Sequence, residues 1–233
     1  MRPVIKGDAP TDASGNPKSY ARYQDAKTDL LQRLGKYCSY CEMELKTGLA
    51  VEHVQPKSLD KTLERNWSNF LLGCVHCNSR KGKQPVDLDD HVWPDRDNTV
   101  LAFEYVALTN TITVATSLRG KNKARAENLI KLVGLQNIPT VWNEDPRFDE
   151  RRTVWAMAMD AKNDLWSRPE SEHPQLRKYI LSVAISKGFF SVWMTVFHDD
   201  PETRRLLIET FVGTAQDCFD SQGSPVQRKG GRL

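Results

Sequence analysis

Hydrophobic and polar positions follow two different periods along this chain. Over residues 20–34, apolar and aromatic side chains recur at helical spacing, and Gly35 follows as a plausible stop. Residues 100–106 and 111–116 are instead rich in Val, Ile, Thr, Phe and Tyr, which predicts a β-hairpin. The first two dozen residues carry Gly and Pro among polar residues, so we expect an arm with little helix or strand of its own.

The second half of the chain carries helical patterns alone. Apolar stripes predict helices between Arg119 and Gly134, over residues 148–166 and over residues 173–187. A last helix is predicted to open with Asp200 as its N-cap and Pro201 at its first position. The tail 222–233 combines Gly with basic residues, and we expect it to be disordered.

These patterns predict an α+β fold in three parts. Residues 1–30 form an N-terminal arm and leading helix, residues 31–120 form a mixed domain that includes the β-hairpin, and residues 121–233 form an α-helical C-terminal domain with a basic tail. The chain has 233 residues and is 39% hydrophobic, which is enough to bury a core as one large or two small domains.

The net charge of the chain says little about whether it binds nucleic acid. The net charge of +3 is compatible with a polyanionic partner, but it falls short of the strongly basic balance of a protein that coats DNA. No apolar run reaches the roughly 18 residues of a membrane span, and the first residues lack the apolar stretch of a secretory signal. We therefore expect a cytoplasmic protein with no membrane contact.

The cysteines indicate a metal site. Four of the five lie in two Cys-x-x-Cys pairs, a spacing that suits a metal better than disulfides in a reducing compartment. Two such turns complete a tetrahedral S4 site, the geometry preferred by Zn²⁺, and a site with four sulfur ligands holds the fold rather than activating water. We expect Zn²⁺ to be bound by Cys38, Cys41, Cys74 and Cys77.

The segment between the two pairs carries the polar residues of a possible active site. In order, the chain reads Cys-x-x-Cys, Glu-His-x-x-Pro from Glu52, Asn-Phe-Leu-Leu from Asn69, and Cys-x-x-Cys-Asn-x-x-Lys from Cys74. This order resembles that of HNH endonucleases, members of the His-Me finger superfamily. The resemblance implies a zinc-clamped ββα-metal domain, with a strand ending near His53, a second strand through Asn69 and a short helix starting around Cys77.

Phosphodiester hydrolysis requires a deprotonated water and a cation that neutralises the developing charge. His53 would be the base, since neutral imidazole suits that role near physiological pH. Glu52 and Asn78 offer hard oxygen ligands, which suit Mg²⁺ or Mn²⁺ more than zinc. By the resemblance, Asn69 would hold the His53 loop through hydrogen bonds rather than bind metal.

Three basic residues follow on the expected helix. Arg80, Lys81 and Lys83 would contact substrate phosphates, a contact that raises affinity without reading sequence. The alternative is an ordinary solvated helix face.

The longer segments narrow the resemblance further. Residues 1–7, 37–42, 51–58 and 67–72, with Trp93-Pro94-Asp95 and Phe103-Glu104-Tyr105, resemble PtuB-type HNH proteins of Septu and retron anti-phage systems, most densely over residues 1–135. That resemblance implies a partner, a PtuA-like ABC-type ATPase, and a nucleic acid substrate, with DNA favoured over RNA. The arm and the helical domain are the candidate contacts for such a partner.

Two other functions fit parts of the pattern. A non-catalytic zinc module would keep the metal and bind nucleic acid or partner proteins, with Glu52, His53 and Asn78 idle. A restriction or homing enzyme of strict sequence specificity has less support, because no helix-turn-helix or repeated finger accompanies the motif.

Overall fold

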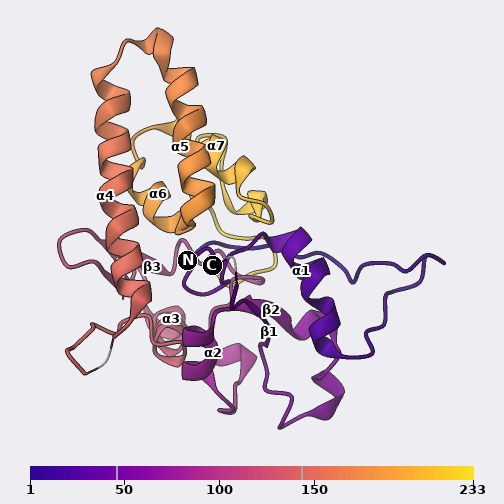
Figure 1. The fold of residues 1–233 in the computed structure, drawn as a ribbon. Coiled ribbons are helices and arrows are strands. Elements are labelled where there is room, and N and C mark those ends of the chain that lie inside the picture. The colour runs from indigo at the N-terminus through magenta and orange to yellow at the C-terminus, as the bar shows by residue number, and fades with distance from the viewer. Residues whose placement is uncertain (46, 143) are drawn as a thin grey trace.

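The computed structural model describes residues 1–45, 47–142 and 144–233 and shows a mixed α/β fold with two small sheets (Figure 1). Within these residues the strands are β1 (Ala50–His53), β2 (Phe70–Gly73), β3 (Phe103–Val106) and β4 (Thr111–Val114). The α-helices are α1 (Lys27–Leu34), α2 (Val75–Lys81), α3 (Gly120–Leu132), α4 (Pro146–Ser167), α5 (His173–Lys187), α6 (Phe190–Val196) and α7 (Pro201–Thr210).

The first sheet is a two-stranded antiparallel pair that leads directly into α2. His53 lies opposite Phe70, and Ala50 lies opposite Gly73. All four β2 residues are buried, which matches the continuous apolar run of this strand. The knuckle of residues 38–41 packs on the same strand, because the backbone N–H of Ser39 donates to the carbonyl of Leu72 at 2.8 Å.

Two boundaries in this region differ from the sequence prediction. The second strand begins at Phe70 instead of running through Asn69, because residues 67–69 form a 3-10 turn capped by the Asn66 side chain. The helix begins at Val75, two residues before Cys77. Its N-cap is Cys74, whose sulfur accepts the backbone N–H of Cys77, so the second cysteine pair and the first turn of the helix are the same piece of chain.

The predicted β-hairpin is confirmed, with Phe103 opposite Val114. The helical patterns of the second half are also confirmed as elements: α5 has the predicted limits, and Asp200 caps α7 by accepting the N–H of Thr203. The α4 and α5 helices pack against each other and form a long antiparallel pair that projects from the remainder of the molecule (Figure 1). The short α6 was not predicted, because nearly all its residues are buried and it shows no polar face.

The two ends of the chain meet near the centre of the molecule (Figure 1). Met1 and Val4 are buried, and the Arg2 guanidinium donates to the carbonyls of Leu34, Phe211 and Val212. The arm therefore docks on its own chain, while residues 11–19 stay exposed.

The prediction of a disordered tail is wrong. Arg228 and Leu233 are buried, and the Arg228 guanidinium donates to the carbonyls of Pro94 and Val4. Backbone groups also join the tail to the first half of the chain, since the N–H of Asn98 donates to the carbonyl of Leu233 at 3.0 Å.

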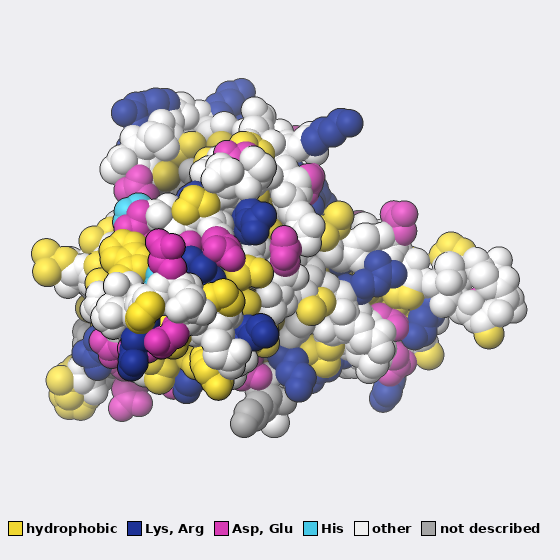
Figure 2. Space-filling model, turned by 90° about the horizontal axis from the view of Figure 1, so that it is seen from above, with side chains coloured by type: hydrophobic (Ala, Val, Ile, Leu, Met, Phe, Trp, Pro, Cys, Tyr) yellow, Lys and Arg dark blue, Asp and Glu magenta, His cyan; other side chains and the backbone are white. Residues whose placement is uncertain are grey.

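One cluster of buried apolar side chains joins both halves of the chain; it includes Leu30, Phe70, Leu129, Trp193 and Phe211. On the face seen in Figure 2, basic and acidic side chains are interspersed among apolar ones, as expected for a small net charge. Among the described helices, none has the length and apolar character needed to cross a bilayer.

Candidate active site and metal centre

Four cysteine sulfurs gather where the two knuckles meet. The Sγ atoms of Cys38, Cys41, Cys74 and Cys77 all lie within 4.8 Å of one another, and all four residues are buried. The Sγ atoms of Cys41 and Cys74 are 3.7 Å apart. Tetrahedral Zn²⁺ with bonds of about 2.3 Å places its sulfurs about 3.8 Å apart, so the cluster fits a zinc site by distance and by donor type.

The sulfurs also receive backbone hydrogen bonds. The N–H of Cys74 donates to Cys38 Sγ, and the N–H of Cys77 donates to Cys74 Sγ, both at 3.4 Å. Such bonds favour thiolate over thiol and orient the sulfurs toward a common centre. Cys218, the fifth cysteine, is buried apart from this cluster.

His53 ends β1 and is held by a carbonyl and two aromatic rings. Its Nε2 lies 3.0 Å from the carbonyl oxygen of Glu64. Tyr23 and Phe70 pack edge-on to the imidazole, with ring centroids 4.7 and 5.3 Å away. If Nε2 carries the proton and donates to this carbonyl, Nδ1 carries the lone pair that can accept a proton.

The surroundings of His53 favour the neutral imidazole. Burial lowers the pKa of His53 below its usual 6.5, and the positive charges of Lys57 and Lys81 lower the pKa further. The bond to the Glu64 carbonyl acts in the opposite direction but is outweighed. A neutral ring is the form that can take a proton from water.

Glu52 lies in the interior next to Lys81. Its side chain is 3% exposed, and its Oε1 lies 3.0 Å from Lys81 Nζ and accepts the hydroxyl of Tyr40 at 3.1 Å. Burial raises the pKa of Glu52, and the charge of Lys81 together with the Lys81 and Tyr40 hydrogen bonds partly offsets that rise. One oxygen of the proposed metal ligand is therefore already engaged.

Lys81 does not occupy the position expected of a phosphate contact. It is 1% exposed, and besides Glu52 it reaches the carbonyl oxygen of His53 at 2.6 Å. The position of Lys81 on α2 directs its side chain into the interior, where it donates to the backbone carbonyl of His53. We correct its predicted role accordingly: Lys81 binds Glu52 and the His53 backbone from the interior instead of contacting substrate phosphates.

Asn69 fastens the loop between β1 and β2. Its Oδ1 accepts the backbone N–H of Gln55 at 2.8 Å, and its Nδ2 donates to the Gln55 carbonyl at 2.9 Å. A weaker contact of 3.4 Å joins Nδ2 to the carbonyl of Leu63. The side chain of Asn69, at one end of this loop, thus holds Gln55 near the other end, two residues after His53.

Gly73 lets Glu52 and Asn78 approach each other across the sheet and helix. A Cβ added at Gly73 would lie 3.0 Å from Glu52 Cβ and 3.8 Å from Asn78 Cβ. Any larger residue would push against the Glu52 side chain. The glycine therefore permits the close packing that places Asn78 beside the end of β1.

A cavity of about 190 Å³ opens at this point. Of the predicted site residues, Glu52, His53, Asn78, Lys81 and Lys83 line the cavity. Asn69 does not line this cavity. Arg80 is on the other side of α2, where it lines two further cavities of about 620 and 210 Å³.

Sequence reasoning missed two residues of this cavity. Tyr23 lies against the His53 ring, and Lys57 Nζ lies 3.8 Å from the centroid of the Tyr23 ring. Lys57 also pairs with the Glu64 carboxylate at 3.0 Å. Lys57 follows His53 closely in the motif and could have been considered, whereas Tyr23 lies 30 positions upstream and carries no signal beyond a helical pattern.

Comparison with known proteins finds a family match for the region that holds the four cysteines and His53. Residues 38–84 match the family model described as HNH endonuclease. The chain is also similar to the Septu protein PtuB of Bacillus thuringiensis, with 28% identity over 124 residues. That match covers 49% of this chain and 48% of PtuB, so it spans about half the length of each.

Proposed function

We propose that this chain is a metal-dependent endonuclease that hydrolyses phosphodiester bonds in nucleic acid, with DNA as the substrate. The match of residues 38–84 to the HNH endonuclease model and the similarity to PtuB support this proposal. The observation that carries the proposal is the position of His53: an imidazole whose surroundings favour the neutral form, held through Nε2, at a cavity that it shares with Asn78, the residue that follows Cys77 of the four-cysteine cluster.

The proposed chemistry begins at Nδ1 of His53. This nitrogen takes a proton from a water molecule, and the oxygen of that water forms a new bond to phosphorus as the bond to the 3′ oxygen breaks. The leaving 3′ oxygen takes up a proton from solvent water, so the products carry 5′-phosphate and 3′-hydroxyl ends. Asn69 keeps the base in position by holding the backbone of Gln55, two residues after His53.

A divalent cation fits this site by the chemistry of the donors. Asn78 and Glu52 line the same cavity and carry amide and carboxylate oxygens, and Mg²⁺ is often held by one or two protein oxygens, waters and substrate phosphate. When bound, Mg²⁺ or Mn²⁺ would neutralise the charge that develops on the phosphate. Glu52 would contribute Oε2, because Oε1 faces Lys81 and Tyr40.

Two other contacts complete the proposal. Lys83 at the cavity and Arg80 on the opposite face of α2 would bind substrate phosphates. Zn²⁺ at the four cysteines would have a structural role, since S4 coordination leaves no open position for water.

The relation to PtuB supports a role in defence against phage. We propose that the chain acts in the cytoplasm as the effector of a Septu-type system, together with a PtuA-like ABC-type ATPase. The exposed surface of the α4 and α5 pair is the part of the chain that we assign to contact with this partner (Figure 1).

One observation favours a second function, a non-catalytic zinc module that binds nucleic acid or proteins. The pairing of Glu52 with Lys81 removes part of the negative charge that a divalent cation requires. An idle site would retain this ion pair and the zinc cluster and would cleave nothing.

His53→Ala separates the two functions. We expect DNA cleavage that requires Mg²⁺ or Mn²⁺ and stops with EDTA, and we expect the variant to lose it while keeping its zinc. Because the His53 ring is buried between Tyr23 and Phe70, the variant should melt at a lower temperature, so cleavage is compared at equal distance below each melting temperature. His198→Ala is the matched control, because this exposed histidine lies outside the site and bonds to the carbonyl of Thr195. The assay is run with the chain alone and with the ATPase. Cleavage that survives in His53→Ala would refute the mechanism.

A further inference from the structure

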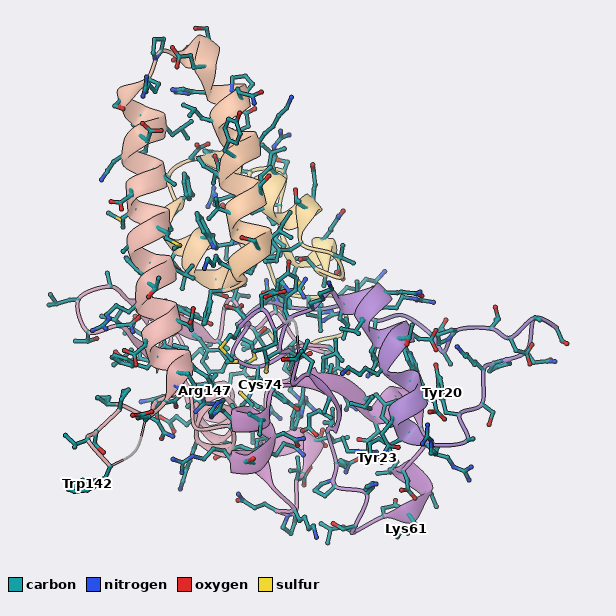
Figure 3. All side chains as sticks on the ribbon, in the orientation of Figure 1. Tyr20, Tyr23, Lys61, Cys74, Trp142 and Arg147 are labelled. Atoms are coloured by element: carbon teal, nitrogen blue, oxygen red, sulfur yellow. The ribbon has the colours of Figure 1, made fainter. Side chains whose placement is uncertain are left out.

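A buried arginine from the helical half of the chain reaches the four-cysteine cluster. Arg147 lies in the first turn of α4, 70 positions after Cys77, and is 2% exposed. Its Nη1 lies 3.3 Å from Cys77 Sγ. Figure 3 shows Arg147 beside the cluster, near the label of Cys74 and the start of α2.

The guanidinium is fixed by hydrogen bonds on every side. Nη1 also donates to the carbonyl of Val133 at 2.8 Å, and Nη2 donates to the carbonyl of Gly134 at 2.9 Å. Nε and Nη2 hold the Asp145 carboxylate at 2.8 and 2.6 Å. All three nitrogens are engaged, so the planar group cannot turn away from the sulfur without breaking several bonds.

This geometry joins three segments at one sulfur. Asp145 and Arg147 begin α4, Val133 and Gly134 follow α3, and Cys77 lies in α2. Asn78, the proposed ligand for the divalent cation, is the next residue along α2. The contact therefore connects the projecting helical pair to the helix that forms one wall of the active site.

A cationic hydrogen-bond donor beside the cluster would stabilise its buried negative charge. Four thiolates around one Zn²⁺ carry a net charge of −2, and this charge is buried. A charge-assisted N–H···S bond stabilises the thiolate form and reduces its tendency to take a proton or leave the metal. Because Asp145 balances the charge of the arginine, we assign the effect to the directed hydrogen bond rather than to the positive charge alone.

We propose that Arg147 is a positioning residue of the zinc site. It holds Cys77 as a thiolate ligand, and zinc retention therefore depends on the packing of the first turn of α4 against the cluster. The proposal rests on the zinc site proposed above. It extends that site from four ligands on two knuckles to a fifth residue contributed by the helical half of the chain.

The test compares two buried arginines one turn apart. Arg151 has the same exposure as Arg147 and also lies near the cluster, but its guanidinium donates to the carbonyl of Asn110 rather than to a sulfur. Arg147→Gln and Arg151→Gln therefore remove equal side chains, and only the first removes an N–H···S bond. Arg147→Lys retains the charge without the planar group.

The measurements are zinc per chain, the rate of zinc transfer to a chromogenic chelator, and the ¹¹³Cd NMR shift of cadmium-substituted protein. We expect Arg147→Gln to release zinc about 10- to 100-fold faster than wild type, the usual cost of losing a residue that bonds to a metal ligand. Arg151→Gln should release zinc near the wild-type rate when both are compared at equal distance below their melting temperatures. The cadmium shift should move in Arg147→Gln and stay in Arg151→Gln.

Equal release rates and equal cadmium shifts in the two Gln variants would overturn the role of Arg147 while leaving the zinc site intact. Wild-type protein without zinc would overturn both. If Arg147→Gln does not fold, Arg147→Lys decides: faster release with an altered cadmium shift supports the proposal, and wild-type values refute it.

Discussion

Replacing Lys81 by methionine tests whether this lysine supports the site from within. Lys81 is 1% exposed and joins Glu52 to the carbonyl of His53 through contacts of 3.0 and 2.6 Å. Methionine keeps most of the length of the side chain but removes the ammonium group. The Glu52 carboxylate, itself buried, would then lose its paired charge and keep only neutral hydrogen-bond donors such as the Tyr40 hydroxyl.

The size of the effect follows from the burial of both partners. Removing one member of a buried ion pair costs about 3 to 5 kcal/mol, because the remaining charge is left without compensation. For a chain of this size each kcal/mol lowers the melting temperature by about 2 to 4 °C, so we expect a fall of about 6 to 20 °C. The lost bond to the His53 carbonyl should also reduce cleavage.

The assay is thermal unfolding of zinc-loaded protein at neutral pH, with Lys83→Met as the control. Lys83 is exposed, two residues further on, and its substitution should change stability by no more than about 0.5 kcal/mol. The double variant Glu52→Gln with Lys81→Met should recover part of the loss, because no charge stays unpaired. If Lys81→Met is no more destabilising than Lys83→Met, Lys81 faces solvent and the assignment to the interior is refuted.

Four further predictions follow from the site and the tail. The cleavage rate should hold at pH 6.5 and fall only below it, because the pKa of His53 is lowered and the base stays neutral; a pH–rate profile that already falls above pH 6.5 would contradict this. The same shift means that His53 favours the fold above pH 6.5 and that this contribution is lost as the pH drops through the lowered pKa, which unfolding of wild type and His53→Ala across pH 5 to 8 would measure. Removing zinc with a strong chelator, or replacing Cys74 by serine, should unfold the region around β1 and α2, seen as lost protection in hydrogen exchange; protection unchanged in zinc-free protein would rule out a structural metal. Arg228→Met should destabilise the fold by about 1 to 3 kcal/mol, because the carbonyls of Val4 and Pro94 lose a buried donor, whereas Lys229→Met should have almost no effect; equal stability of the two variants would mean that the tail does not pack.

The parts of the site that were predictable are those encoded by local spacing. The Cys-x-x-Cys pairs predicted a sulfur cluster, and the described chain brings all four sulfurs together. The caps and stripes of the helical half predicted α5 with its observed limits and the Asp200 cap of α7. Within each cysteine pair and within each helix the interacting residues are close in sequence, so their spacing determines the local geometry. The meeting of the two pairs followed from the four ligands that a structural zinc site requires.

The remaining parts depend on contacts between distant segments. Lys81 follows Arg80 as a second basic residue, and only its pairing with Glu52, 29 positions earlier, shows that it is buried. Tyr23 and Arg147 approach the site from outside the motif, and their local sequence shows no sign of it. The tail has the composition of a disordered segment, but its arginine finds carbonyls more than 130 positions away.

The packed tail also bears on how this protein is made. The backbone of Asn98 bonds to Leu233, and Arg228 closes over Val4, so the interior of the first half is finished by residues that the ribosome adds more than 100 steps later. Contacts of such long sequence separation slow folding and leave apolar surface exposed while translation proceeds. The first half, which carries the candidate site, should therefore reach its final packing only after residues 228–233 have left the ribosome.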